Sequence, residues 1–144
     1  MSDIISAEQL SQRIISDSND AIMFADRQGS ILLWNRGAEK MFGYSESEAL
    51  GQSLDLIIPE NLRGRHWDGY FRVMESGSSR YSTEMLSAPA LHKDGSRIST
   101  EFSMVIVKGD DERVLGVAAI IRNVSARWQR EKELKERIRV LENK

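Results

Sequence analysis

The chain has 144 residues, a length that suits one domain better than two. Hydrophobic residues make up 40% of it, which is enough for a sizeable buried core and excludes a disordered chain. The formal net charge is −2 with both signs mixed along the chain, so we expect neither a nucleic-acid-binding surface nor a polybasic membrane anchor. Cysteine is absent, which excludes disulfides, thiolate metal sites and cysteine nucleophiles.

The first residues do not have the pattern of a targeting segment. Acidic and polar residues stand where a signal peptide has a basic and then an apolar run. No apolar stretch approaches the roughly 20 residues that cross a bilayer. With the lack of cysteine, this predicts cytoplasmic localisation and no direct membrane binding.

The N-terminal part of the chain predicts one helix and two strands. Residues 4–18 carry spaced apolar residues, and Ser6 with Gln9 has the spacing of a capping box, so we expect a short amphipathic helix. Compact apolar runs follow at 21–25 and 31–34, separated by the turn sequence Asp-Arg-Gln-Gly. Two short strands joined by a tight turn are the simplest interpretation.

Two short helices are predicted next. Asn35 is a suitable N-cap for a helix that Gly43 ends. Ser45 with Glu48 forms a second capping box, which predicts a brief helix stopping at Gly51.

A longer helix and three strands complete the domain. Pro59 suits the first turn of a helix from about 60 to 75 because it has no amide to donate. Three strand-like runs follow, separated by two hairpin signals: 81–91, 97–107 and 114–124. Pro89 predicts that the first of these strands ends early or has a bulge.

The order of these elements predicts an α+β fold, with a five-stranded antiparallel sheet, short helices over one face, and flanking N- and C-terminal helices. We expect an N-terminal helix in 1–19, the sheet domain in 20–125 and a separate C-terminal helix in 126–144. The longer helix would form one wall of any pocket.

At this point the sequence resembles the PAS superfamily of sensory domains over nearly all of its length up to Val124. The motifs that carry the resemblance are DRQGSI at 26–31, WNRGAEKMFGY at 34–44, EALG at 48–51, PE at 59–60, KDGS at 93–96 and RNVS at 122–125. Asn123 stands where the family usually has aspartate.

The resemblance implies a regulatory module and not an enzyme. PAS domains sense ligands, redox state or light, or mediate dimerisation, and they regulate an attached effector such as a histidine kinase or cyclase. The cysteine-adduct flavin type and the p-coumarate type both need a cysteine and are therefore excluded. The sequence has no phosphate loop, nucleophile motif or metal cluster of its own.

His66 is the most informative candidate site residue. Residues 59–66 (PENLRGRH) are similar to the helix of haem-containing oxygen-sensor PAS domains, in which the histidine at this position is the axial iron ligand. The resemblance implies that His66 would ligate haem iron and that Arg63 or Arg65 would approach the propionates. Gly69 would leave space beside a flat ring, and Tyr70 shares the face of His66.

The later strand supplies the remaining candidates, Met85 and Leu86. The family's oxygen sensors have an arginine on a later strand that contacts bound gas, whereas these two residues are apolar. Met85 has the chemistry of a second iron ligand. One alternative stays open: His66 packs in the core of a haem-free domain that binds another small apolar or planar ligand. An aromatic cage of Trp34, Trp67 and Tyr70 is disfavoured, because Trp34 ends a strand and Trp67 lies off the His66 face.

The C-terminal helix carries Leu134, Ile138 and Leu141 at spacings of four and three, with charged residues on either side. This seam predicts a parallel homodimer whose helices carry a signal to the effector. The alternative function is a ligand-free PAS module that serves dimerisation or partner binding with a packed, empty core.

Overall fold

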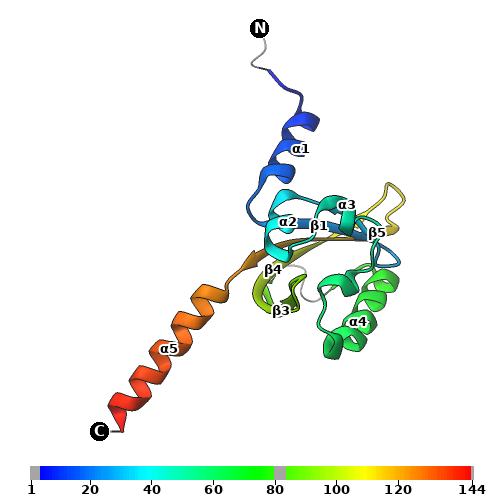
Figure 1. Ribbon diagram of the computed structural model, residues 1–144. Helices are drawn as coiled ribbons and strands as arrows, with labels where there is room; N and C mark the ends of the chain where they lie inside the picture. Colours follow the sequence, from blue (N-terminus) through cyan, green and yellow to red (C-terminus); the bar gives the residue numbers. More distant parts are fainter. Residues whose placement is uncertain (1–3, 80–83, 144) are drawn as a thin grey trace.

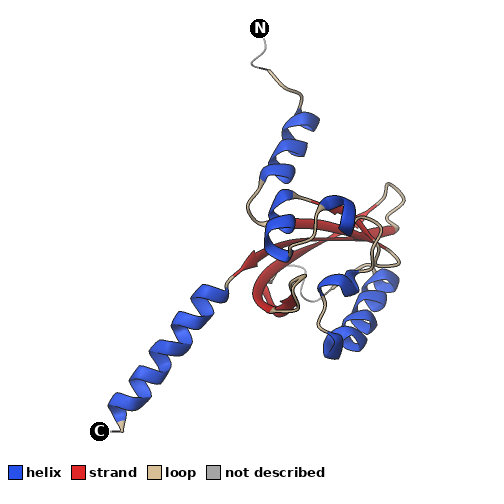
Figure 2. Cartoon of the chain, viewed as in Figure 1, coloured by secondary structure: helices blue, strands red, loops and turns tan. Residues whose placement is uncertain are grey.

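The computed structural model describes residues 4–79 and 84–143. Within them lie five α-helices, two short 3-10 helices and five strands (Figures 1 and 2). In chain order these are α1 (Ala7–Asp17), β1 (Ala21–Asp26), β2 (Ile31–Trp34), α2 (Arg36–Phe42), α3 (Glu46–Ala49), η1 (Leu54–Ile57), η2 (Glu60–Leu62), α4 (Arg63–Ser76), β3 (Leu86–Leu91), β4 (Arg97–Lys108), β5 (Val114–Asn123) and α5 (Ser125–Glu142).

The five strands form one sheet in the order β2-β1-β5-β4-β3, and each neighbouring pair is antiparallel. The helices α2, α3 and α4 lie over one face of this sheet, while α1 and α5 leave the domain in different directions (Figure 1). The predicted α+β fold is therefore confirmed. None of the helices among the described residues is both long and apolar enough to cross a membrane.

The predicted helix caps are present. The Ser6 side chain accepts from the Gln9 amide, and Ser45 forms the same capping box with Glu48. Asn35 accepts from the Ala38 amide at the start of α2. At the other end of α2, the C-cap glycine has φ of 85°, a left-handed conformation that favours glycine. The helix after Ser45 ends at Ala49, two residues before the predicted stop.

The longer helix differs from the prediction in its first turn. Residues 60–62 form a 3-10 turn, and the α-helix proper begins at Arg63. Pro59 is the residue that flanks this turn, with an extended ψ of 139°, so it precedes the helix instead of lying inside it.

The prediction for Pro89 is wrong. Strand β3 runs through Pro89 to Leu91, and its pairing with β4 shows no register shift. The reason is that β3 is an edge strand, where a residue without an amide N–H can stand with its missing donor turned away from the ladder. The first predicted residues of this strand, 81–83, lie outside the described residues.

One half of the core is closely packed around β1, β2 and α2. Trp34 and Phe42 are almost completely buried, and their ring centroids lie 5.5 Å apart. The Asn35 side chain joins three elements there, because its Oδ1 accepts from the Ile22 and Ala38 amides while its Nδ2 donates to the Ile15 carbonyl at 2.7 Å. This half fixes the position of the sheet under the helices.

The other half of the same sheet face is less covered. Phe102, Met104 and Ile106 on β4 point to the same side as the buried residues of β1, because they pair across the sheet through β5. All three are only half-buried, as are Val117 and Ala119 on β5. Phe102, Ile106, Val117 and Ala119 pack against the core cluster to which Tyr70 and Met74 of α4 belong, so this partly covered apolar surface faces the side of α4.

Candidate functional site

Helix α4 is anchored to the first hairpin by Tyr70. Its hydroxyl donates to the carbonyl of Asp26 at 2.5 Å and lies 3.1 Å from that of Ala25. Burial, together with the negative charge of Asp26, raises the pKa of Tyr70. Tyr70 is therefore a structural anchor between α4 and β1, and its hydroxyl is already engaged.

His66 lies one turn before Tyr70, with the two ring centroids 5.7 Å apart. Its Nδ1 is buried and has no hydrogen-bond partner among the described residues. Burial lowers the pKa of His66, and the carboxylate of Asp55 opposes this only in part. The imidazole is therefore neutral at neutral pH and has an unused ring nitrogen, as a metal ligand or a hydrogen-bonding group requires.

The α4 surface beside His66 is open at Gly69. Among the described residues, a Cβ placed on Gly69 would meet no atom within 4 Å outside the neighbouring residues and backbone of its own helix, although Gly69 is half-buried. Leu62 and Val73, which share this side of the helix, are also half-buried. The α4 surface one turn beyond His66 is thus free of side chains at Gly69, and a role for Gly69 in binding stays a prediction.

The two arginines are placed differently from each other. The Arg63 guanidinium donates to the carbonyls of Ile58 and Asp55 at 3.0 and 3.2 Å, and its Nε lies 3.8 Å from the Asp55 carboxylate. Arg63 therefore ties the first residue of α4 to the preceding loop, residues 55–58. Arg65 is exposed on the helix. Of the two, only Arg65 has no such structural engagement with that loop.

Leu86 is the first residue of β3, and Met85 immediately precedes the strand. Met85 is 65% exposed, so its side chain is not enclosed in the core. Leu86 is half-buried and pairs with Phe102, which places it on the inner face of the sheet. The structure thus brings Leu86, and not Met85, into the partly covered apolar surface.

One contact in this region was not predicted from the sequence. The Trp67 indole donates to the Asp55 carboxylate at 2.7 Å, and its ring lies against the first hairpin. A Cβ on Gly29 would come within 2.1 Å of this ring, so only glycine fits there. Since the two partners of the hydrogen bond are 12 residues apart, no local spacing signals it. Trp34 instead packs against Phe42, so the structure groups it with a different cluster from Trp67 and Tyr70.

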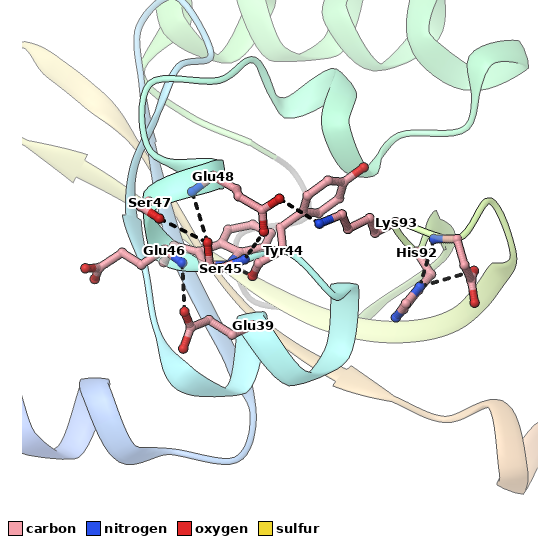
Figure 3. A network of polar contacts seen from close by, with 10 residues as sticks. Glu39, Tyr44, Ser45, Glu46, Ser47, Glu48, His92 and Lys93 are labelled. Atoms are coloured by element: carbon pink, nitrogen blue, oxygen red, sulfur yellow. Dashed lines mark hydrogen bonds and ion pairs between the residues drawn. The ribbon is translucent and has the colours of Figure 1, made fainter.

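A polar network joins the short helices to the β3–β4 turn (Figure 3). Lys93 Nζ lies 2.6 Å from the Glu48 carboxylate and 5.7 Å from the centre of the Tyr44 ring. The hydrogen bond from Lys93, with that from the Ser45 amide, lowers the pKa of Glu48 to about 2. The Lys93 amide also donates to the Phe42 carbonyl at 2.8 Å. These contacts close one end of the domain.

The junction between the sheet and α5 is also well defined. Asn123 Oδ1 accepts from the Ser125 amide at 2.9 Å, so asparagine supplies the acceptor that starts the turn. Arg127, in the first turn of α5, pairs with Glu101 on β4 and lies 3.8 Å from Glu131 one turn further on. The start of α5 is thus held on the outer side of the sheet.

Comparison with known proteins places these features in a family. The family model described as "PAS domain" matches residues 19–126. The chain is 26% identical over 125 residues to "Oxygen sensor protein DosP" of Escherichia coli (strain K12), covering 87% of this chain and 14% of that protein. It is 42% identical over 64 residues to "Sensor protein FixL" of Bradyrhizobium diazoefficiens, covering 44% of this chain and 11% of that protein.

Solved structures give the same fold. The crystal structure of the PAS domain of a Colwellia psychrerythraea protein superposes with a TM-score of 0.73 at 24% identity, covering 84% of this chain and 99% of that one. The chain spans less than a fifth of the length of the curated relatives it matches. The family match over most of the sequence, together with the five-stranded antiparallel sheet, shows that this chain belongs to the PAS domain family of sensory modules.

Proposed function

We propose that this PAS domain senses a small, largely apolar molecule held between α4 and the inner face of β3–β5. The observation that carries the proposal is the half-buried state of inward-facing residues there, since Phe102, Met104 and Ala119 belong to a sheet face that is fully buried at β1. Apolar side chains that stay partly covered inside a domain are a typical setting for a ligand. His66 supplies the polar group that would orient it.

Haem is the specific candidate that the residues support in part. His66 would be the axial ligand, because its imidazole is neutral and its Nδ1 has no hydrogen-bond partner in the part of the chain that the structure describes. Gly69 leaves the adjacent space free. Of the arginines, Arg65 is the candidate for the propionates, since Arg63 is engaged with the loop carbonyls. Haem iron, when bound, would supply gas or redox sensing, and one of the relatives is named an oxygen sensor.

An absorption spectrum of the purified domain during a hemin titration tests this proposal. The expected result is a Soret band that saturates at one hemin per chain and is lost in His66→Ala. The matched control is His92→Ala. It removes the second histidine of the chain, which lies at the β3–β4 turn, and should leave the Soret band unchanged. An identical spectrum for wild type and His66→Ala would contradict haem ligation by His66.

The apolar-ligand proposal has its own test. Binding of small apolar fluorophores should be lost when Gly69 is replaced by Leu, because the new side chain would occupy the open space beside His66. The control is Gly64→Leu, at a second α4 position with free space but on another side of the helix. Equal binding by both variants would argue against a site next to Gly69.

We infer further that signal output passes through a dimer of α5 to an attached effector. PAS domains are generally non-catalytic sensory modules, so catalysis would belong to an effector such as a histidine kinase or cyclase. The exposed apolar residues of α5 support the dimer. The same observation favours a second candidate, a ligand-free dimerisation module. Dimerisation without any ligand binding in either of the tests above would select that candidate.

A further inference from the structure

A polar cleft lies between the C-terminal end of α4 and the hairpin that joins β4 to β5. It holds about 280 Å³, a volume near the lower end of small-molecule sites. The β1–β2 turn also contributes to this cleft, whose lining includes Arg27, Glu75, Gly77, Lys108, Glu112 and Arg113. We propose that the cleft binds a free α-amino acid with an acidic side chain, at a second site separate from the apolar one beside His66.

Two arginine side chains offer the cleft a place for a carboxylate. Arg27 is half-buried, and its Nη1 donates to the Val114 carbonyl at 2.8 Å, which holds the guanidinium in position. Neither Arg27 nor Arg113 forms an ion pair with a carboxylate of residues 4–79 or 84–143. A guanidinium binds a carboxylate through two parallel hydrogen bonds, so a ligand carboxylate fits these two side chains.

The same cleft offers places for a positive group. Glu75 forms no ion pair within the described part of the chain, and the Glu112 carboxylate lies as far as 4.0 Å from Lys108 Nζ. The last turn of α4 contains no basic residue, and the carbonyl groups that end a helix favour a nearby positive charge. An ammonium group on the ligand therefore fits here.

The backbone at Glu112 gives an independent reason to assign its side chain a role. Glu112 has a φ of 64° and is the one residue other than glycine with a positive φ among those that the structure describes. Its amide donates to the Gly109 carbonyl at 3.0 Å within the hairpin, a position that glycine would occupy with less strain. A glutamate kept in a strained position on the wall of a cleft points to a use for its carboxylate.

The balance of charge specifies the side chain of the ligand. Three cationic side chains line the cleft, those of Arg27, Lys108 and Arg113, against the two carboxylates of Glu75 and Glu112. L-glutamate has two carboxylates and one ammonium group, so it complements this excess of one positive charge. A dicarboxylate without the ammonium would face both glutamates with no group to pair with them, so a plain anion fits less well.

An NMR titration of the full chain with L-glutamate at constant ionic strength tests the proposal. The amide signals of Gly77 and Arg113 should shift and saturate with an affinity of about 1 mM, which suits an open, polar site. Two matched probes identify the groups that bind: glutarate lacks the ammonium, and L-glutamine lacks the side-chain carboxylate. Each should bind at least roughly threefold more weakly. Shifts that do not saturate, or glutarate that binds as tightly as L-glutamate, would overturn the proposal.

Two variants separate binding from stability. Arg113→Gln should weaken L-glutamate binding roughly three- to tenfold, whereas Arg13→Gln, which removes an exposed arginine of α1, is the matched control. Glu112→Gly should weaken binding to a similar degree and yet raise the melting temperature by about 2–4 °C, because the strain at this position is relieved. A merely structural role for Glu112 would not move the two measurements in opposite directions.

Unchanged affinity in both Arg113→Gln and Glu112→Gly would show that L-glutamate binds elsewhere and would overturn this site. His66→Ala, the variant that tests the haem proposal, should leave L-glutamate binding unchanged, because His66 is not among the residues that line the cleft. The two sites can therefore fail or stand separately. Loss of L-glutamate binding in His66→Ala would contradict a second, separate site.

Discussion

The two halves of the inner sheet face have similar residues but different burial. One row across the sheet consists of Met23 on β1, Ala119 on β5 and Met104 on β4. Met23 is 2% exposed, whereas Ala119 and Met104 are half-buried. In a neighbouring row the exposure of the side chains also increases, from the buried Ala21 on β1 to the half-buried Phe102 on β4.

The difference lies in what covers the sheet. At β1 the short helix α2 packs directly on the strand, with Ala38 and Phe42 completely buried. On the other half the nearby helix is α4, which contacts β5 and whose flank carries Gly69 in place of a larger side chain. One half is therefore closely packed, while the other is covered less completely, which is where we place the proposed ligand site.

The largest expected effect comes from removing a ring in each half. Phe42→Ala should lower the free energy of unfolding by about 3–5 kcal/mol, because it leaves a cavity among completely buried side chains. Phe102→Ala removes the same atoms from a half-buried site and should cost about half as much. Urea denaturation followed by circular dichroism measures both. Equal losses would mean that the two halves are packed alike.

Two glycine substitutions, one in each half, should change the stability of the domain in opposite directions. A Cβ on Gly37 in α2 would lie 2.2 Å from the Asp20 carbonyl oxygen, so Gly37→Ala should destabilise the domain by about 1–3 kcal/mol. Gly69→Ala meets nothing within 4 Å and should stabilise α4 by about 0.5–1 kcal/mol. The melting temperatures of the two variants report this directly, and a destabilised Gly69→Ala would show that the α4 flank is already filled.

Local signals in the sequence predicted most of the fold. The capping boxes, the Asn35 cap and the turn sequences each act within a few residues, so helix and strand positions follow from the chain itself. Pro89 was misjudged for a non-local reason: whether a proline interrupts a strand depends on whether that strand lies at an edge, and the strand order decides this.

The site was less predictable for the same reason. The position of His66 on the inner side of α4 followed from helical spacing, but the engagement of Arg63 with Asp55 and Ile58 depends on how the preceding loop folds. The hydrogen bond from the Trp67 indole to the Asp55 carboxylate likewise joins two segments that share no sequence pattern. Periodicity indicates which face of a helix turns inward, whereas the degree of burial depends on the neighbouring elements.

The dependence of stability on pH reports how deeply His66 is buried in the less covered half of the domain. Because burial lowers the folded-state pKa of His66 below 6.5, the unfolded chain takes up this proton more readily than the folded one. Stability should therefore fall as the pH drops through about 6.5, and His66→Phe should remove this part of the pH dependence. His92→Ala is the control that keeps it. An unchanged pH profile in His66→Phe would indicate that the ring is solvated and its surroundings are open to water.

The smallest expected effect concerns the contact that joins the two halves, the pair of Glu48 on α3 and Lys93 in the β3–β4 turn. The depressed pKa of Glu48, about 2 against an ordinary 4.5, means that its contribution to stability is present above pH 4.5 and is lost as the pH falls towards 2. Both side chains are exposed, so the effect on stability should be slight. Lys93→Met should return the pKa of Glu48 part of the way towards 4.5 in an NMR titration, while the hydrogen bond from the Ser45 amide still holds it below that value. If the pKa stayed near 2 in this variant, the capping box of α3 alone would account for it, and the Lys93 side chain would contribute nothing to the ionisation of Glu48.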